Sequence, residues 1–183
     1  MKIGIVTPAP PGSRHGNRVT ALRWARILRS LGHHVTITQN YEDESYDLLI
    51  ALHALRSHKA IKRFHCERPD RPLVVALTGT DLYHDLPRSE RARLSLELAT
   101  RLIALQPKAF DTLPEHLHAK TRVIYQSVEP FPKLRNPRAP IRNFTVCVIG
   151  HLRKVKDPFR AAMAARLLPA SSRIRIIHVG GAM

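Results

Sequence analysis

The fold is decided by residues 2–38, which read KIGIVTPAPPGSRHGNRVTALRWARILRSLGHHVTIT. Two short apolar runs in this segment, Lys2–Thr7 and His34–Thr38, have the length and composition of buried strands. The residues between them follow a helical period, for which Asn17 is the expected cap and Gly32 the expected left-handed stop. The spacing predicts that one row of side chains forms the buried helix face: Val19, Leu22, Ala25, Leu28 and Leu31.

The same alternation of strand and helix continues along the chain. Further strands are predicted at 46–52, 73–77, 102–105 and 122–126, and helices at 57–64, 88–99 and 107–116. This order is typical of βαβ units and a mostly parallel sheet. We therefore expect an α/β fold in which residues 1–130 form one complete Rossmann-like domain.

A change of composition marks the end of that domain. Residues 131–142 are rich in proline and basic residues, as expected for a linker between domains. A second unit follows, with predicted strands at 144–149 and 174–179 around a helix at 157–168. Because one βαβ unit cannot bury both faces of its sheet, residues 143–183 are expected to be the start of an incomplete second domain.

The composition indicates a globular protein with anionic partners. Hydrophobic residues make up 44% of the 183 residues, and the net charge is +16, with 22 Arg against 8 Lys. Arginines recur at helical spacing at Arg18, Arg23, Arg26 and Arg29, which leaves open a solvated face or a continuous track for a polyanion. Aromatic residues are only 5% and do not interleave with the basic ones, so no nucleic-acid partner is expected.

Cysteine usage and hydropathy favour a cytoplasmic location. Cys66 and Cys147 are far apart, and neither lies in a CxxC pair, so we expect no disulfide framework. Histidines such as His33, His34, His116 and His118 lie at predicted surface turns without matching carboxylates or cysteines, so we expect no metal site. We expect no cofactor either. No apolar stretch approaches the length of a spanning helix, so we expect no stable membrane insertion.

The loop after the first strand has the features of an anion site. Two glycines allow close backbone approach, the following helix offers free N–H groups, and two arginines supply charge. The candidate residues are Gly12, Ser13, Arg14, His15, Gly16, Asn17 and Arg18. Their G-x-x-x-G spacing matches neither the dinucleotide fingerprint nor the P-loop. The alternative is a plain turn with exposed arginines.

Two other strand ends carry polar residues that belong to the same edge of a parallel sheet. Thr80 and Asp81 follow the strand at 73–77, and His53 ends the strand at 46–52. We expect Thr80 to contact the ligand bound at this edge, and Asp81 and His53 to be catalytic there. The alternatives are that Asp81 caps the next helical turn and that His53 is a hydrogen-bonded structural residue.

The second unit has its own basic strand-to-helix loop. A glycine, three cationic side chains and a helix start make Gly150, Arg153, Lys154 and Lys156 a candidate site for a diphosphate. The alternative is a basic surface loop.

Two Rossmann-like domains with an anion loop in each resemble the GT-B glycosyltransferases, especially those of the family 4 type. Within them, the run KIGIVTPAPPGSRHGNRVTA at 2–21 and the run VALTGTDLY at 75–83 resemble the selenosugar synthases of selenoneine biosynthesis. The resemblance covers essentially the whole chain. It implies transfer of N-acetylglucosamine from a UDP-sugar donor, UDP-N-acetylglucosamine, to selenophosphate, with formation of a carbon–selenium bond. The anion loop at 12–18, together with Thr80, would then hold this acceptor.

The resemblance also assigns the donor site. Gly150 and Lys156 match the family 4 pattern, but His151 stands where an arginine is usual, so Arg153 or Lys154 would supply the second charge. The family's paired glutamates, which contact the donor ribose, would lie beyond Met183, so the chain alone is expected to be inactive. Two alternatives remain: a family 4 enzyme with a hydroxyl acceptor, and a polyanion-binding module without enzymatic activity.

Overall fold

The computed structural model describes residues 1–129 and 144–181. The chain divides into two compact units, Met1–Pro130 and Phe131–Met183. The predicted linker, residues 131–142, lies outside the described residues.

The first unit is built on a six-stranded parallel sheet with the order β2-β1-β3-β4-β5-β6. Its strands are β1 (Lys2–Val6), β2 (His34–Thr38), β3 (Leu48–Leu52), β4 (Leu73–Leu77), β5 (Arg101–Ala104) and β6 (Thr121–Val123). The predicted α/β class and parallel sheet are confirmed, and this unit is Rossmann-like.

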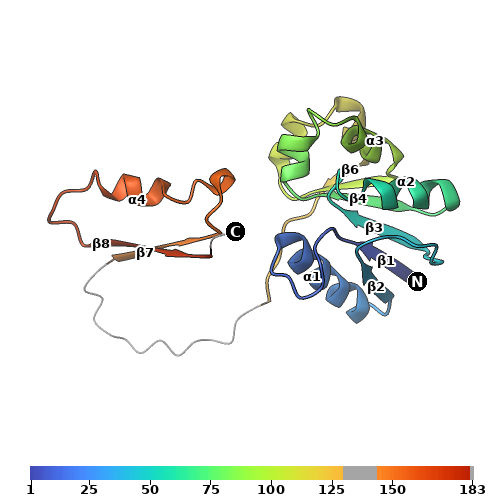
Figure 1. Ribbon diagram of the computed structural model, residues 1–183, viewed down its shortest axis with the longest axis horizontal. Helices are drawn as coiled ribbons and strands as arrows, with labels where there is room; N and C mark the ends of the chain where they lie inside the picture. Colours follow the sequence, from blue (N-terminus) through green and yellow to red (C-terminus); the bar gives the residue numbers. More distant parts are fainter. Residues whose placement is uncertain (130–143, 182–183) are drawn as a thin grey trace. The chain divides into compact units, whose positions relative to one another are not determined.

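Helices cover both faces of the sheet. The regular helices are α1 (Gly16–Ser30), α2 (His58–Glu67) and α3 (Glu90–Leu98), and shorter helical turns occupy η1 (Asp81–Asp85), η2 (Pro107–Asp111) and η3 (Glu115–Lys120). Figure 1 shows α1 on one side of the sheet and α2 and α3 on the other. Successive strand residues therefore point into different layers. Ile5 packs in the cluster that holds α1, whereas Val6 packs in the cluster that holds α2 and α3.

The buried face of α1 differs from the predicted one. Ala21 and Ala25 are fully buried, whereas Val19, Leu22 and Leu31 are exposed. A step of three residues falls about 60° short of a full helical turn, so a strict three-residue row drifts around the helix. Ala25 and Leu28 of the predicted row are confirmed as part of the packed face, and Ala21 and Trp24 complete it.

Several element boundaries also differ from the predictions. The helix predicted at 107–116 is two separate 3₁₀ turns, η2 and η3, with Pro114 at the N-cap of the second. The helix predicted from residue 88 begins at Glu90, because the hydroxyl of Ser89 accepts a hydrogen bond from the amide of Ala92 and caps it.

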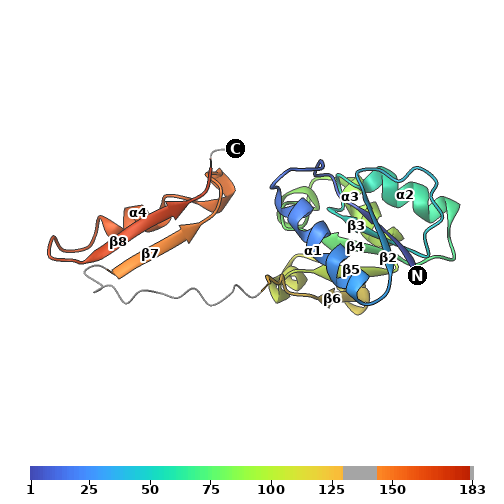
Figure 2. The same cartoon turned by 90° about the horizontal axis from the view of Figure 1, so that it is seen from below.

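The second unit is smaller and more open. It contains β7 (Phe144–Ile149), the 3₁₀ turn η4 (Lys154–Lys156), α4 (Arg160–Ala165) and β8 (Ile174–Val179), and the two strands pair in parallel. Figure 2 shows this strand pair with α4 along it. Every residue of 144–181 is at least partly exposed, so this unit has no closed core within the described residues.

Candidate functional site

The sheet order locates a ligand crevice in the first unit. From β1 the chain moves to β2 on one side, whereas β3 to β6 extend on the other side, so the order reverses between β1 and β3. In open α/β sheets, ligands bind outside the carboxyl ends of the strands at such a reversal. The loop that follows β1 and the residue His53 that follows β3 therefore lie at this edge.

The loop after β1 is held by its own polar groups. The buried Thr7 donates its amide to the carbonyl of Thr38, and its hydroxyl accepts from the amide of Ala9. Gly12 has a φ of 77°, a left-handed conformation that favours glycine. The first helix starts at Gly16, so the predicted capping role of Asn17 is wrong. His15 is the N-cap residue, and its side chain forms no cap hydrogen bond.

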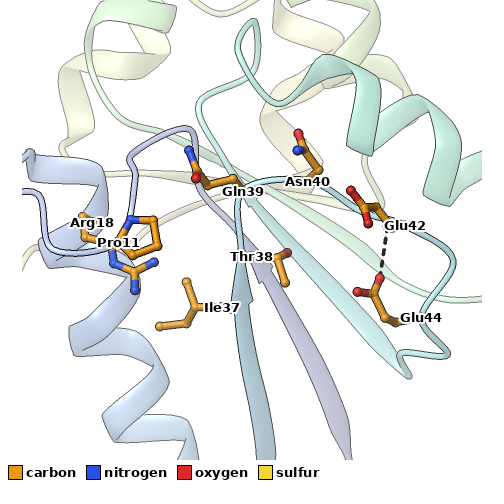
Figure 3. Close-up of a pocket in the computed structure, with 8 residues that line it drawn as sticks. All are labelled: Pro11, Arg18, Ile37, Thr38, Gln39, Asn40, Glu42 and Glu44. Atoms are coloured by element: carbon orange, nitrogen blue, oxygen red, sulfur yellow. Dashed lines mark hydrogen bonds between the residues drawn. The ribbon is translucent and has the colours of Figure 1, made fainter.

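A cavity of about 230 Å³ lies between this loop and the segment after β2 (Figure 3). Its lining residues are Pro11, Arg18, Ile37, Thr38, Gln39, Asn40, Glu42 and Glu44. The Nε atom of Arg18 and the hydroxyl of Thr38 are buried and have no hydrogen-bond partner among the described residues. Unpaired buried polar groups are costly, so these two atoms are available to a bound ligand or water.

The cavity carries charges of both signs. Figure 3 shows Arg18 beside Pro11 on one side and Glu42 and Glu44 on the other. A carboxylate oxygen of Glu44 accepts a hydrogen bond from the amide of Glu42 at 3.1 Å, which fixes this acidic turn. A ligand that matches the lining therefore presents an anionic group to Arg18 and hydrogen-bond donors to the acidic side.

Only one of the predicted acceptor residues lines this cavity. Arg18 does, whereas Gly12, Ser13, Arg14, His15, Gly16, Asn17 and Thr80 do not. Arg14, His15 and Thr80 are exposed, and the hydroxyl of Ser13 is buried without a partner among the described residues. This cavity therefore brings together Arg18 with the segment after β2, and Arg14 is not part of its lining.

Asp81 joins two of the strand-end loops. It is fully buried, and its carboxylate accepts one hydrogen bond from the amide of Ala54 at 2.9 Å and another from the amide of Thr78 at 2.8 Å. Both oxygens are thus engaged with backbone, and no polar atom of this side chain faces solvent. This geometry supports a positioning role for Asp81, and its predicted catalytic role stays a prediction.

His53 is also enclosed. It is 3% exposed and has a φ of 75°, which is rare for a residue other than glycine. Its Nδ1 accepts a hydrogen bond from the amide of Arg56 at 3.3 Å, which leaves the proton of the neutral ring on Nε2, 3.8 Å from Asp85. Burial lowers the pKa of His53, and this effect outweighs the negative charge of Asp81, which raises the pKa. This neutral, engaged ring does not support the predicted catalytic contact.

The arginine row of α1 does not form a continuous track. Arg23 and Arg26 both pair with Glu129, in the segment after β6. Arg29 instead donates to the carbonyl of Val35. These three guanidinium groups therefore tie the helix to its neighbours, and Arg18 is the member of the row that lines a cavity.

The basic loop of the second unit is exposed. Arg153, Lys154 and Lys156 are all exposed and form no ion pair with the described residues. The helix predicted to start at Asp157 begins at Arg160 and is only six residues long, so the predicted helix start does not lie at this loop. The carbonyl of Gly150 accepts from His178 at 2.7 Å and is thus engaged within the unit.

Sequence reasoning missed the acidic side of the Arg18 cavity. Residues 39–44 follow β2, and their polar character at a strand end is the signal that singled out Asp81. It also missed Asp85, which approaches His53.

Neither a model of a known protein family nor a curated protein matches this chain. No group of three or more metal-binding side chains occurs in residues 1–129 and 144–181. Within the same ranges, every helix is too short or too polar to cross a membrane.

Proposed function

We propose that the chain is part of a GT-B glycosyltransferase that transfers N-acetylglucosamine from UDP-N-acetylglucosamine to selenophosphate. Three features support the proposal. Residues 2–21 and 75–83 resemble the selenosugar synthases, the first unit has a Rossmann-like sheet with a reversal of strand order, and the second unit starts another parallel βαβ arrangement with a basic loop.

The state of Arg18 is the observation that carries the proposal. Its guanidinium forms no hydrogen bond with the described residues, although its Nε is buried in a cavity at the strand ends. An arginine held in this way retains its fork of N–H donors for an oxyanion. The amides at the start of α1 are further donors at the same end of the loop.

The proposed reaction needs positioning and charge more than proton transfer. The selenium of selenophosphate attacks the anomeric carbon, the carbon–oxygen bond to the diphosphate breaks, and UDP leaves with the electron pair. An anionic nucleophile requires no deprotonation, which agrees with a neutral, engaged His53 and a buried Asp81. In this scheme Arg18 holds the acceptor, and Arg153 and Lys156 stabilise the leaving diphosphate.

A second candidate is a family 4 enzyme with a hydroxyl acceptor that also carries a phosphate. The acidic side of the cavity favours it, because Glu42 and Glu44 accept hydrogen bonds from hydroxyl groups, whereas they repel a small polyanion. The amides of Gln39 and Asn40 add further partners for a sugar.

Binding of selenophosphate to the chain tests the acceptor site. Arg18→Ala should weaken binding about tenfold or more, as expected for loss of a charged hydrogen bond. Arg26→Ala is the matched control, because this arginine lies on the same helix but pairs with Glu129, and its effect should stay below about twofold. Calorimetry under nitrogen measures both, and equal affinities of the wild-type chain and Arg18→Ala would refute the assignment.

An acceptor comparison separates the two candidates. The assay uses the complete enzyme of which this chain is proposed to be a part. With UDP-N-acetylglucosamine held constant, release of UDP reports transfer to selenophosphate, thiophosphate or a sugar phosphate. Transfer to selenophosphate with none to the sugar phosphate supports the first candidate. The reverse result, together with a loss of transfer in Glu44→Gln, supports the second.

A further inference from the structure

A second concave surface lies in the helical layer of the first unit. Between α2 and α3 there is an open groove of about 460 Å³, lined by His58, Lys59, Lys62, Arg63, Cys66 and Arg91. It shares no residue with the Arg18 cavity. Its volume falls within the range of about 300–1,000 Å³ that small-molecule sites occupy.

The groove gathers more positive charge than the ion pairs among the described residues neutralise. Lys59, Lys62 and Arg63 occupy positions i, i+3 and i+4 of α2, so they share one side of this helix. Among them only Arg63 forms an ion pair with a described residue, at 2.6 Å from Glu67. Arg91 adds a fourth cation from α3 and also has no ion-pair partner within the described residues.

The pKa of His58, which lies at the wall of the groove, is affected by this charge. Its Nδ1 lies 2.9 Å from the hydroxyl of Ser95, which fixes the ring between the two helices. Burial lowers the pKa of His58, and the charges of Arg91 and Lys62 lower it further. Like charges at this spacing on a helix are destabilising unless an anion offsets them.

We propose that this groove binds a soluble ligand that carries two or more phosphate groups. Lysine and arginine are the usual partners of phosphate oxygens, and four cations around one concavity match a multiply charged anion better than a single charge. A lipid surface fits less well, because the lining contains no large apolar side chain that would enter a bilayer. The inference is independent of the glycosyltransferase proposal.

Titration of the full chain with tripolyphosphate tests the proposal. Lys62→Glu replaces an exposed cation at the centre of the cationic side of α2 and should weaken binding about tenfold or more. Lys59→Glu is an independent second variant with the same expectation. Lys108→Glu is the matched control, because Lys108 is exposed on η2 outside the groove and forms no ion pair with the described residues.

The controls separate a site from a general effect of net charge. Circular dichroism confirms that each variant is folded, and the control should change the affinity less than about twofold. Equal weakening by Lys108→Glu would overturn the proposal, as would an unchanged affinity in both groove variants. Binding to phosphatidylglycerol vesicles without binding of tripolyphosphate would overturn it too, because the ligand would then be a lipid surface.

Discussion

The loops that follow β1 and β7 have the same sequence pattern but differ in structure. Each follows a strand and contains glycine and basic residues before a helix. The loop after β1 leads into a helix of 15 residues and borders a cavity with buried polar atoms. The loop after β7 leads into a 3₁₀ turn, and its cations are exposed. The pattern alone therefore does not build an anion site.

The difference follows from what surrounds each loop. The first unit has six strands with apolar clusters on both faces of its sheet, and the segment after β2 closes one side of the loop. The second unit has two strands and one helix of six residues. Burial by neighbouring elements restricts side chains and makes unpaired polar atoms costly, and it is this burial that the second loop lacks.

Core truncation should give the largest contrast between the units. Phe64 is fully buried in the first unit, so Phe64→Ala should cost about 3–5 kcal/mol of unfolding free energy. Ile176→Ala removes a half-buried side chain of the second unit and should cost less than about 1 kcal/mol. Urea unfolding followed by fluorescence of Trp24, the single tryptophan, measures the first unit. An equal shift of this transition by Ile176→Ala would contradict the contrast.

Removal of the Asp81 charge should have the next largest effect. Asp81→Asn keeps the shape of the side chain, but its NH2 group cannot accept, so one of the two hydrogen bonds from the amides of Ala54 and Thr78 is lost and the other loses its charge. We expect a loss of about 1.5–3 kcal/mol in the same urea experiment. Asp70→Asn alters an exposed aspartate and should stay within about 0.5 kcal/mol. Equal stability of Asp81→Asn and the wild type would argue against a positioning role.

Acidification should destabilise the first unit through the buried His53 and the partly buried His58. The pKa values of His53 and His58 are lowered in the folded chain, so the unfolded chain binds more protons as the pH falls below about 6.5. Stability from these groups is present above that pH and is lost as the pH falls toward their folded pKa values. The urea midpoint should therefore be lower at pH 5 than at pH 7.5.

The range from pH 7.5 to pH 5 separates the titration of these histidines from that of the carboxylates. Glu67 and Asp47 have pKa values below their ordinary ones, so they lose their stabilising charge only at more acidic pH. His58→Gln should reduce the dependence between pH 7.5 and pH 5. A midpoint that rises on acidification would contradict the assignment of neutral, buried rings.

Local patterns predicted the elements better than the site. The strands at 73–77, 144–149 and 174–179 were predicted with the observed bounds, because strands of parallel sheets appear as continuous apolar runs. Arg18 was predicted from its loop, but its acidic counterparts Glu42 and Glu44 were not. Nor was the bond of Asp81 to the amide of Ala54, which lies 27 residues away. Such contacts depend on strand order, which periodicity does not encode.

The smallest effect is expected at the segment that follows β6. Glu129 pairs with Arg26 and Arg23, and these guanidinium groups lower its pKa. All three side chains are at least partly exposed, so Glu129→Gln should leave the unfolding transition of Trp24 unchanged. The amides of segment 124–129 should instead exchange faster, because Glu129 accepts from Arg23 and Arg26 of α1. The other side-chain contacts of this segment with α1 among the described residues are those of Ser127 with Arg23 and of Gln126 with Thr20.

Hydrogen exchange of a peptide that covers residues 124–129 measures this local change. The control is Glu115→Gln, because Glu115 is exposed and forms no ion pair with the described residues. Faster exchange in Glu129→Gln alone would show that this part of the arginine row serves the fold. Unchanged exchange would remove that role from Arg23 and Arg26, and their charge would again be available to an external anion. The contrast between Arg18 and the rest of its row would then no longer hold.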